Sequence, residues 1–401
     1  MRSLTPLAVV LLLVAASLPV SIAATNIALA LLTAVLLTRS GNGGTARALE
    51  TWRRTPAVWG ILLYCLTGLA ATIFGIDPAR SLHDNAKDFH KLWVLLILIS
   101  AFSEESPRAV WTALACGFAT IAAIGLGQTA ISAFRHQPGF PFPRPHAFVH
   151  PVVYGEQLAL CLLGGLCALL RPAEILSKVP ARRLGAALMA LTTAILVFNQ
   201  TRSTVFALAG GCAVIFSLEP TSRKRVVWMG VTLLCVAATW EFLPTGDRRS
   251  LFRLLVDFNP RDSQNARYVL WSVALGMFRD HPLTGVGPGH YGTLFTQYFQ
   301  GALDNESVWS SAHNLFFHQL AERGLIGAAG LIAALGTLAF GAWRGARLGT
   351  GARSLWAASA LAAFLVMNLT EVAFQNEQVT TLVLFLWAWG TTPLRARGEN
   401  L

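Results

Sequence analysis

Residues 310–330 read SSAHNLFFHQLAERGLIGAAG, and the chain changes character within this stretch. A polar opening that contains His313 and Asn314 leads directly into a segment that stays largely apolar as far as residue 343. This segment exceeds the roughly 20 residues that cross the hydrocarbon core of a bilayer. The stretch therefore predicts a helix that enters a membrane just after His313.

The composition of the whole chain agrees with a membrane protein. Hydrophobic residues make up 54% of the 401 residues and charged residues only 13%, and the mean hydropathy is +0.54. A soluble protein of this length needs more charge to cover its surface. The six cysteines lie in apolar segments and form no CxxC pair, which predicts packing residues rather than disulfides or metal ligands. We expect an all-α polytopic membrane protein.

Apolar runs along the chain predict about twelve membrane-spanning helices. The runs cover residues 5–22, 25–38, 57–74, 91–103, 109–132, 151–170, 184–200, 203–218, 226–242, 314–343, 354–371 and 378–392. The first two runs predict an uncleaved hairpin rather than a signal peptide. The chain then divides into spans one to nine (residues 1–242), a large loop with amphipathic helices (residues 243–312), and spans ten to twelve (residues 313–401).

The loops between these runs sort by charge. One side collects the basic clusters, among them a basic loop over residues 39–54, together with both chain ends. By the positive-inside rule that side is cytoplasmic, so the net charge of +11 indicates topology before it indicates nucleic acid. The opposite side carries three long loops, residues 75–90, 133–150 and 243–312, and the short turn NQTRS at residues 199–203.

The outward side still carries many cations, which the positive-inside rule does not explain. These cations are Arg80, Lys87, Lys91, Arg135, Arg144, Arg202, Arg248, Arg249, Arg253, Arg261, Arg267, Arg279 and Arg323. Most of them are ordinary for a soluble loop, but Arg202 lies between two apolar runs, where an unpaired cation is costly. Arg202 either reaches lipid phosphate or recognises an anionic substrate, because a planar guanidinium binds phosphate oxygens in pairs.

Residues 264–299 combine a helical pattern with a glycine-rich turn. Arg267, Leu270 and Ala274 recur at helical spacing, which predicts an amphipathic helix able to lie on the membrane surface. The sequence HPLTGVGPGHY at residues 281–291 has three glycines and two prolines, which predicts a shaped turn rather than a flexible linker. A nucleotide site is disfavoured, because no strand–helix unit surrounds the turn.

The remaining polar residues limit the kinds of reaction that the protein could catalyse. His136, His146 and His150 have no carboxylate or cysteine at ligand spacing, so a metal site is disfavoured. The outward side has no phosphate-binding loop and no nucleophile motif, so an enzyme there must receive a substrate that is already activated. Acidic residues are scarce within the spans, where Glu156 and Glu371 are the nearest candidates for a proton relay.

His313 is the candidate general base, since it opens the tenth span at the outward interface and histidine exchanges protons near neutral pH. The alternative is that His313 only satisfies the start of the helix. His318, one turn deeper and on another face, is interpreted as structural.

Four motifs between residues 140 and 330 carry a resemblance to a known family. They are RPHAFVHP at residues 144–151, NQTRST at 199–204, HPLTGVGPGHYG at 281–292, and His313-Asn314 followed by Glu322-x-Gly324-x-x-Gly327. In this order the chain resembles the bacterial O-antigen ligase/polymerase superfamily of inner-membrane glycosyltransferases. One position departs from the family's pattern, because Ala147 stands where the family often has glycine, and this weakens the transfer of a role to Arg144.

Length and the single mid-sized third loop look most similar to O-antigen ligase. The resemblance implies a GT-C-like helical fold with a helical periplasmic domain, in the bacterial inner membrane, with its active site on the periplasmic side. It implies an inverting, metal-independent glycosyltransferase without a cofactor. The donor would be a glycan on undecaprenyl diphosphate and the acceptor a sugar of lipid A–core, both in the phospholipid membrane, and no nucleic acid is involved.

Carried onto this sequence, the resemblance makes His313 the general base and Arg202 and Arg267 the ligands of the diphosphate, with Arg144 as a weaker third. Other functions remain open at this point. A polymerase of the same superfamily would use similar residues, as would a protein O-glycosylating relative, and a transporter of lipid-linked sugars would need a polar path through the bundle.

Overall fold

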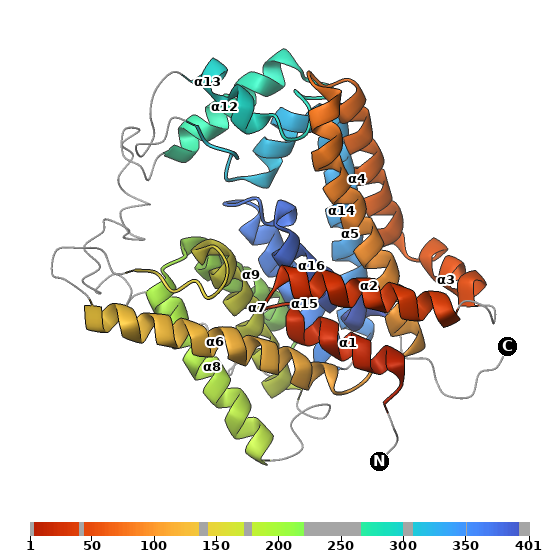
Figure 1. The fold of residues 1–401 in the computed structure, drawn as a ribbon, viewed down its shortest axis with the longest axis vertical. Coiled ribbons are helices and arrows are strands. Elements are labelled where there is room, and N and C mark those ends of the chain that lie inside the picture. Colours follow the sequence, from red (N-terminus) through yellow and green to blue (C-terminus); the bar gives the residue numbers. More distant parts are fainter. Residues whose placement is uncertain are drawn as a thin grey trace.

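A computed structural model describes residues 4–39, 44–135, 143–171, 179–219, 266–299, 308–349 and 351–392 (Figure 1). Within these ranges the chain forms α-helices and one short 3-10 helix, with no strand. The prediction of an all-α protein is confirmed for this part of the chain.

The first nine helices are α1 (Pro6–Ser17), α2 (Ile22–Arg39), α3 (Gly44–Arg53), α4 (Pro56–Ile73), α5 (Pro78–Glu104), α6 (Val110–Arg135), α7 (Pro151–Leu170), α8 (Val179–Asn199) and α9 (Arg202–Leu218). The later elements are α12 (Ala266–Asp280), α13 (Tyr291–Tyr298), α14 (Leu315–Leu348), α15 (Ala352–Met367), η5 (Ala373–Gln375) and α16 (Glu377–Thr391).

Five of these helices, α2, α4, α6, α7 and α14, are long and apolar enough to cross a membrane. Four shorter apolar segments accompany them: α1, the Arg183–Asn199 part of α8, α9 and α15. Eleven of the twelve predicted spans coincide with a helix, and the remaining one, residues 226–242, lies outside the described residues. The chain is therefore a membrane protein with several apolar helices, and the count of twelve spans stays a prediction.

Two segments that were expected to be loops are helical. Within residues 39–54, α3 forms because Trp52 anchors one of its faces, donating from its indole nitrogen to the Ser100 hydroxyl of α5 at 2.9 Å. Within residues 75–90, the helix starts early because the Asp77 carboxylate caps α5, accepting from the backbone nitrogens of Ala79 and Arg80 at 3.1 and 3.2 Å. A capping aspartate before a proline is a local start signal that hydropathy alone does not register.

α12 and α13 lie at one end of the molecule, at the top of Figure 1, against the first part of α14. The helix predicted around Arg267 is confirmed, but its apolar face does not lie on a membrane surface. Leu270 and Ala274 are buried with Tyr291 and Phe295 in a small second core. The physical reason is that α13 and α14 cover this face and remove it from both water and lipid.

α14 is interrupted at Gly324, whose φ of 58° and ψ of −158° leave the helical region. The glycine-rich turn lies in this interruption. The Val286 nitrogen donates to the Ala321 carbonyl at 3.0 Å, and the Leu325 nitrogen donates to the Pro282 carbonyl at 2.9 Å. The turn thus satisfies backbone groups that the broken helix leaves open, which hydrocarbon surroundings require. The fixed conformation of this turn therefore stabilises the break in α14.

Two cations that were grouped with the ordinary outward residues are instead buried and paired. The Asp88 carboxylate contacts the Lys91 ammonium at 2.8 Å and the Arg323 guanidinium at 2.5 Å, and all three residues are almost completely buried. Arg323 also lies over the ring of Tyr64, with 4.7 Å from its guanidinium carbon to the ring centroid. Charges this deep persist only when they are paired, so removal of one partner is expected to be strongly destabilising.

The interruption of α14 generates a prediction about stability. Gly324→Ala places a methyl group 2.4 Å from the backbone carbonyl of Leu283 in a left-handed conformation, so the free energy of unfolding is expected to fall by roughly 2–5 kcal/mol. Gly336→Ala, on the same helix with no atom within 4 Å of the added carbon, is the matched control and should leave stability unchanged or slightly raised. Thermal unfolding in detergent compares the two, and equal melting temperatures would contradict the prediction.

Candidate functional site

The segment before α14 fixes the position of His313. Asn314 caps the helix, with its side-chain oxygen accepting from the Phe316 nitrogen at 3.0 Å, while its amide nitrogen donates to the Leu369 carbonyl at 2.8 Å. His313 has a φ of 46°, a left-handed conformation that is uncommon for a residue with a side chain. Asn314 therefore caps the helix. The sharp turn of the backbone at His313 leaves the histidine side chain available for another contact.

That contact is with Glu371, in the connection between α15 and α16. The Nδ1 atom of His313 lies 2.7 Å from Oε2 of Glu371. Because a carboxylate accepts hydrogen bonds and does not donate them, Nδ1 carries the proton of the neutral ring in this pair. The Nε2 atom then holds the free lone pair that a general base needs, on a side chain that is 32% exposed.

Glu371 also joins Arg267 to the same site. The Nη2 atom of Arg267, at the start of α12, donates to Oε1 of Glu371 at 3.2 Å and to the Thr370 carbonyl at 3.3 Å. The sequence singled out Arg267 and His313 separately, and one carboxylate brings them together. Glu371 is the residue that sequence reasoning undervalued, since it was noted only as a scarce acid near a span.

A second group of polar residues joins the loop before α7 to the turn before α9. Arg144 donates from Nε to the Asn199 carbonyl and from Nη2 to the Thr201 hydroxyl, both at 2.7 Å. Asn199 in return donates to the carbonyls of Pro145 and Pro151, both at 2.9 Å. The two motifs that were recognised separately in the sequence thus form one unit.

Arg202 is the first residue of α9 and directly follows the Thr201 contact of Arg144. Its side chain is half-buried. Arg144 and Arg202 are therefore brought to the same junction, where the amino-terminal end of α9 adds a positive end of the helix dipole. Arg144 itself uses two of its three nitrogens to hold the turn.

The position that departs from the family pattern keeps the geometry of glycine. Ala147 has a φ of 48°, and Gln128 of α6 holds its backbone, accepting from the Ala147 nitrogen at 2.9 Å and donating to its carbonyl at 3.1 Å. A left-handed residue is what glycine supplies most readily. The alanine therefore does not displace the loop that carries Arg144.

His150 connects the two groups electrostatically. Its Nδ1 atom accepts from the Val152 nitrogen at 3.3 Å and caps α7. Burial lowers the pKa of His150 below the usual range of histidine, and the positive charge of Arg144 lowers it further. Glu371 and His313 also act on this pKa, in opposite directions. His150 is thus neutral at pH 7 and lies within electrostatic range of both groups.

Aromatic side chains border the site. The ring of Trp309 lies edge-on to His313 with 5.4 Å between ring centroids, and Trp271 stacks on Phe317 at 5.2 Å. Such rings can face the apolar side of a sugar. His318, interpreted as structural, is buried beside Glu322, with 3.5 Å between its Nε2 atom and the carboxylate.

Of the other cations named from the sequence, Arg248, Arg249, Arg253 and Arg261 lie outside the described residues, as does His136. Across the ranges that the structure does describe, no group of three or more His, Cys, Asp or Glu side chains could hold a metal ion.

Taken together, the fold and the site define a helical membrane protein whose histidine, carboxylate and arginines gather where several apolar helices begin or end. Residues 185–332 match the family model described as O-antigen ligase, a segment that includes Arg202, Arg267 and His313, and this match supports membership of the chain in the O-antigen ligase family. The matched segment leaves out Arg144 and Glu371, which the structure adds to the site. No curated protein matches the sequence.

The backbone of Ala147 generates a prediction. Ala147→Gly should leave the melting temperature unchanged or raise it, because relief of a left-handed alanine, about 1–2 kcal/mol, offsets the lost methyl group. Ala147→Val should lower it, because a branched side chain fits this conformation poorly. If the glycine variant loses as much stability as the valine variant, packing rather than backbone conformation governs this position.

Proposed function

We propose that this protein is an O-antigen ligase that transfers a glycan from undecaprenyl diphosphate to a sugar hydroxyl of lipid A–core, on the periplasmic face of the bacterial inner membrane. The family match supports a glycosyltransferase-like enzyme. The observation that carries the proposal is the convergence of His313 and Arg267 on the two oxygens of Glu371.

In the proposed step, the hydroxyl oxygen of the acceptor sugar attacks the anomeric carbon of the donor glycan. The bond between this carbon and the diphosphate oxygen breaks, and its electron pair leaves with the diphosphate, so that the configuration inverts. Nε2 of His313 takes the proton of the attacking hydroxyl. Each bond and proton is accounted for by the donor, the acceptor and this one side chain.

Glu371 acts as a positioning residue in this proposal. Its hydrogen bond to Nδ1 selects the ring tautomer with a free Nε2, and its negative charge stabilises the imidazolium that forms when His313 takes a proton. The Arg267 contact keeps the carboxylate oriented toward the histidine. A base held in this way is ready before the acceptor arrives.

Arg202 and Arg267 are proposed to neutralise the diphosphate as negative charge develops on the leaving group, with Arg144 as a weaker third. The contacts of Arg144 with Asn199 and Thr201 favour a positioning contribution, since they hold the turn from which α9 and Arg202 start. No metal ion is required, because these cations and the helix end supply the positive charge.

The function is tested with purified protein in detergent, lipid-linked glycan as donor, EDTA in the buffer, and lipid A–core present or absent. Glycan attached to lipid A–core is the expected product. Glycan that only lengthens on its carrier would identify a polymerase of the same superfamily. Transfer that EDTA abolishes would overturn the metal-independent step, and movement of labelled lipid-linked sugar across proteoliposomes without any product would favour a transporter.

Separate variants are expected to fail in separate ways. His313→Ala and Glu371→Gln should retain donor binding and lower kcat by about 10²- to 10⁴-fold, the usual contribution of a general base. Arg202→Ala and Arg267→Ala should weaken donor binding as well, and lysine should rescue them poorly because it lacks the two-pronged contact with phosphate. Donor affinity by calorimetry and initial transfer rates measure the two effects independently.

His83→Gln is the matched control for the histidine variants, because His83 is exposed on α5 and contacts none of these residues. It should leave both donor affinity and kcat unchanged. Equal donor affinity in the histidine and arginine variants would contradict the proposal that His313 transfers the proton while Arg202 and Arg267 bind the donor.

A further inference from the structure

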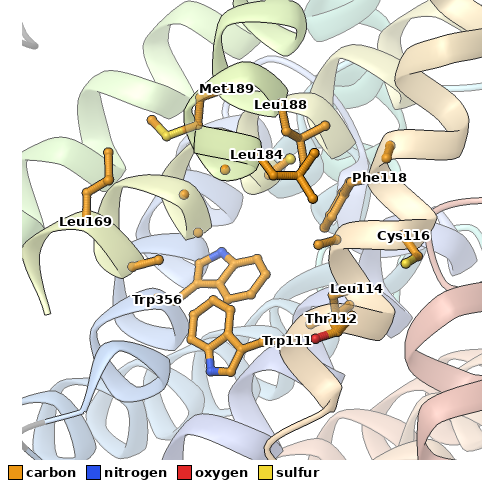
Figure 2. A pocket seen from close by; sticks show the side chains of 17 residues that line it. Trp111, Thr112, Leu114, Cys116, Phe118, Leu169, Leu184, Leu188, Met189 and Trp356 are labelled. Atoms are coloured by element: carbon orange, nitrogen blue, oxygen red, sulfur yellow. The ribbon is translucent and has the colours of Figure 1, made fainter. Parts of the chain in front are cut away.

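A half-open cavity of about 350 Å³ lies among α6, α7 and α8, with Trp356 of α15 (Figure 2). Its walls are almost entirely apolar and include Phe118, Leu188 and Met189. Trp111 and Trp356 stack at one end, with 5.0 Å between ring centroids. The indole nitrogen of Trp356 donates to the Leu160 carbonyl at 2.9 Å, so this ring presents only carbon to the cavity.

The cavity opens onto the outer surface of the bundle. Leu169 and Leu184, which line it, are 40% and 73% exposed. Gly185 lines the α8 side, and no atom lies within 4 Å of the position that its Cβ would occupy. This opening lies between helices that are apolar enough for a membrane, and in a bundle that spans a bilayer it faces lipid rather than water.

The cavity is distinct from the His313 site. Its lining residues on α7 run from Cys161 to Leu169, which are 11 and 19 residues beyond His150. At 1.5 Å per helical residue they lie roughly 16–28 Å along the helix from the level of His150. On α6 the lining residues are likewise in the first part of the helix, far from the loop that carries Arg144. The cavity therefore occupies the other end of these helices.

Two exposed arginines are close in sequence to lining residues of the cavity. Arg108 precedes the lining residue Trp111 by three positions, and Arg183 directly precedes Leu184. Basic side chains next to an apolar cavity between membrane helices are complementary to an acidic lipid headgroup. An apolar cavity with polar groups only at its margin is also typical of a ligand site, and its volume lies near the lower end of the usual range of about 300–1,000 Å³.

We propose that this cavity binds one acyl chain of an anionic glycerophospholipid, with the lipid phosphate held beside Arg183 at the exposed rim of the cavity. A laterally open, apolar space fits a single hydrocarbon chain, and Arg183, which directly precedes the exposed rim residue Leu184, favours a negative headgroup in the leaflet farther from His313. The donor's polyprenyl tail is disfavoured, because its diphosphate would lie at the His313 end. The proposal requires only that the bundle spans a membrane and is independent of the proposed transfer reaction.

The test uses delipidated full-length protein titrated with phosphatidylglycerol that carries a bromine-labelled acyl chain, which quenches nearby tryptophans. Native mass spectrometry counts the bound lipids in parallel. Wild-type protein should bind one phosphatidylglycerol tightly, with quenching that falls in Trp356→Phe. Gly185→Leu adds a side chain at the cavity wall, where the added Cβ meets no atom within 4 Å, and should weaken this binding by tenfold or more.

Two matched controls separate the cavity from the general membrane surface. Gly127→Leu adds the same side chain at an exposed position of α6 that also has free space, and should bind as wild type does. Arg183→Gln should lose the preference for phosphatidylglycerol over phosphatidylcholine, whereas Arg135→Gln, an exposed arginine at the far end of α6, should keep it.

Equal binding by the two leucine variants would overturn the cavity as the site. Equal affinity for the two headgroups in wild-type protein would overturn the anionic assignment. Displacement of phosphatidylglycerol by stoichiometric undecaprenyl phosphate would assign the cavity to a polyprenyl chain instead. The transfer rate of Gly185→Leu reports on the ligase separately, so failure of one proposal is distinguishable from failure of the other.

Discussion

The interruption of α14 at Gly324 is the constraint on which the end of the protein that carries α12 and α13 depends. A helix in a membrane must satisfy every backbone polar group, and a break within it is stable only when another segment supplies partners. The turn at residues 281–291 does so, with hydrogen bonds to Ala321 and Leu325. Because this turn continues from α12, the break also fixes the helix that carries Arg267. The same turn thus satisfies the backbone of α14 and positions the helix that carries Arg267.

Glu371 joins the helix that carries Arg267 to His313, the candidate general base. Its two oxygens contact residues that are 46 positions apart in the chain, Arg267 and His313, so the carboxylate is oriented from both sides. A carboxylate that accepts from Nδ1 of an imidazole favours the ring tautomer with its proton on Nδ1. Glu371 and His313 also influence the pKa of His150 in the neighbouring loop. Burial and the charge of Arg144 lower this pKa, so that His150 is neutral at pH 7. Glu371 and His150 thus lie where the group around His313 and the group around Arg144 approach each other.

Polar contacts and the apolar cavity lie toward opposite ends of α6 and α7. α6 and α7 bear the Ala147 loop between them at one end and line the lipid-sized cavity near the other. The buried Asp88, Lys91 and Arg323 form a further charged group, which is paired internally and joins α5 to α14. Such a group ties helices together without exposing charge to lipid. Lys91 and Arg323 are therefore cations with a structural partner, and the proposed function assigns the diphosphate to other arginines.

Much of this could be predicted from the sequence. Apolar runs located nearly every helix, because burial in lipid demands continuous hydrophobicity. The order of the family-like motifs singled out His313, Arg202 and Arg267. These residues lie at junctions between loops and helices, where polar side chains are expected. Helices α3 and the start of α5 were missed, because caps and single anchoring side chains such as Asp77 and Trp52 are weak signals beside hydropathy.

The sequence by itself determined that the chain is a helical membrane protein, and it predicted a histidine and several arginines on one side of the membrane. Only the tertiary structure decided which residues meet: Glu371 between Arg267 and His313, Arg144 on the turn before Arg202, and Lys91 and Arg323 on Asp88. The physical reason is that hydropathy acts along the chain, residue by residue. Pairing of charges depends on distances between segments far apart in sequence, which packing alone sets.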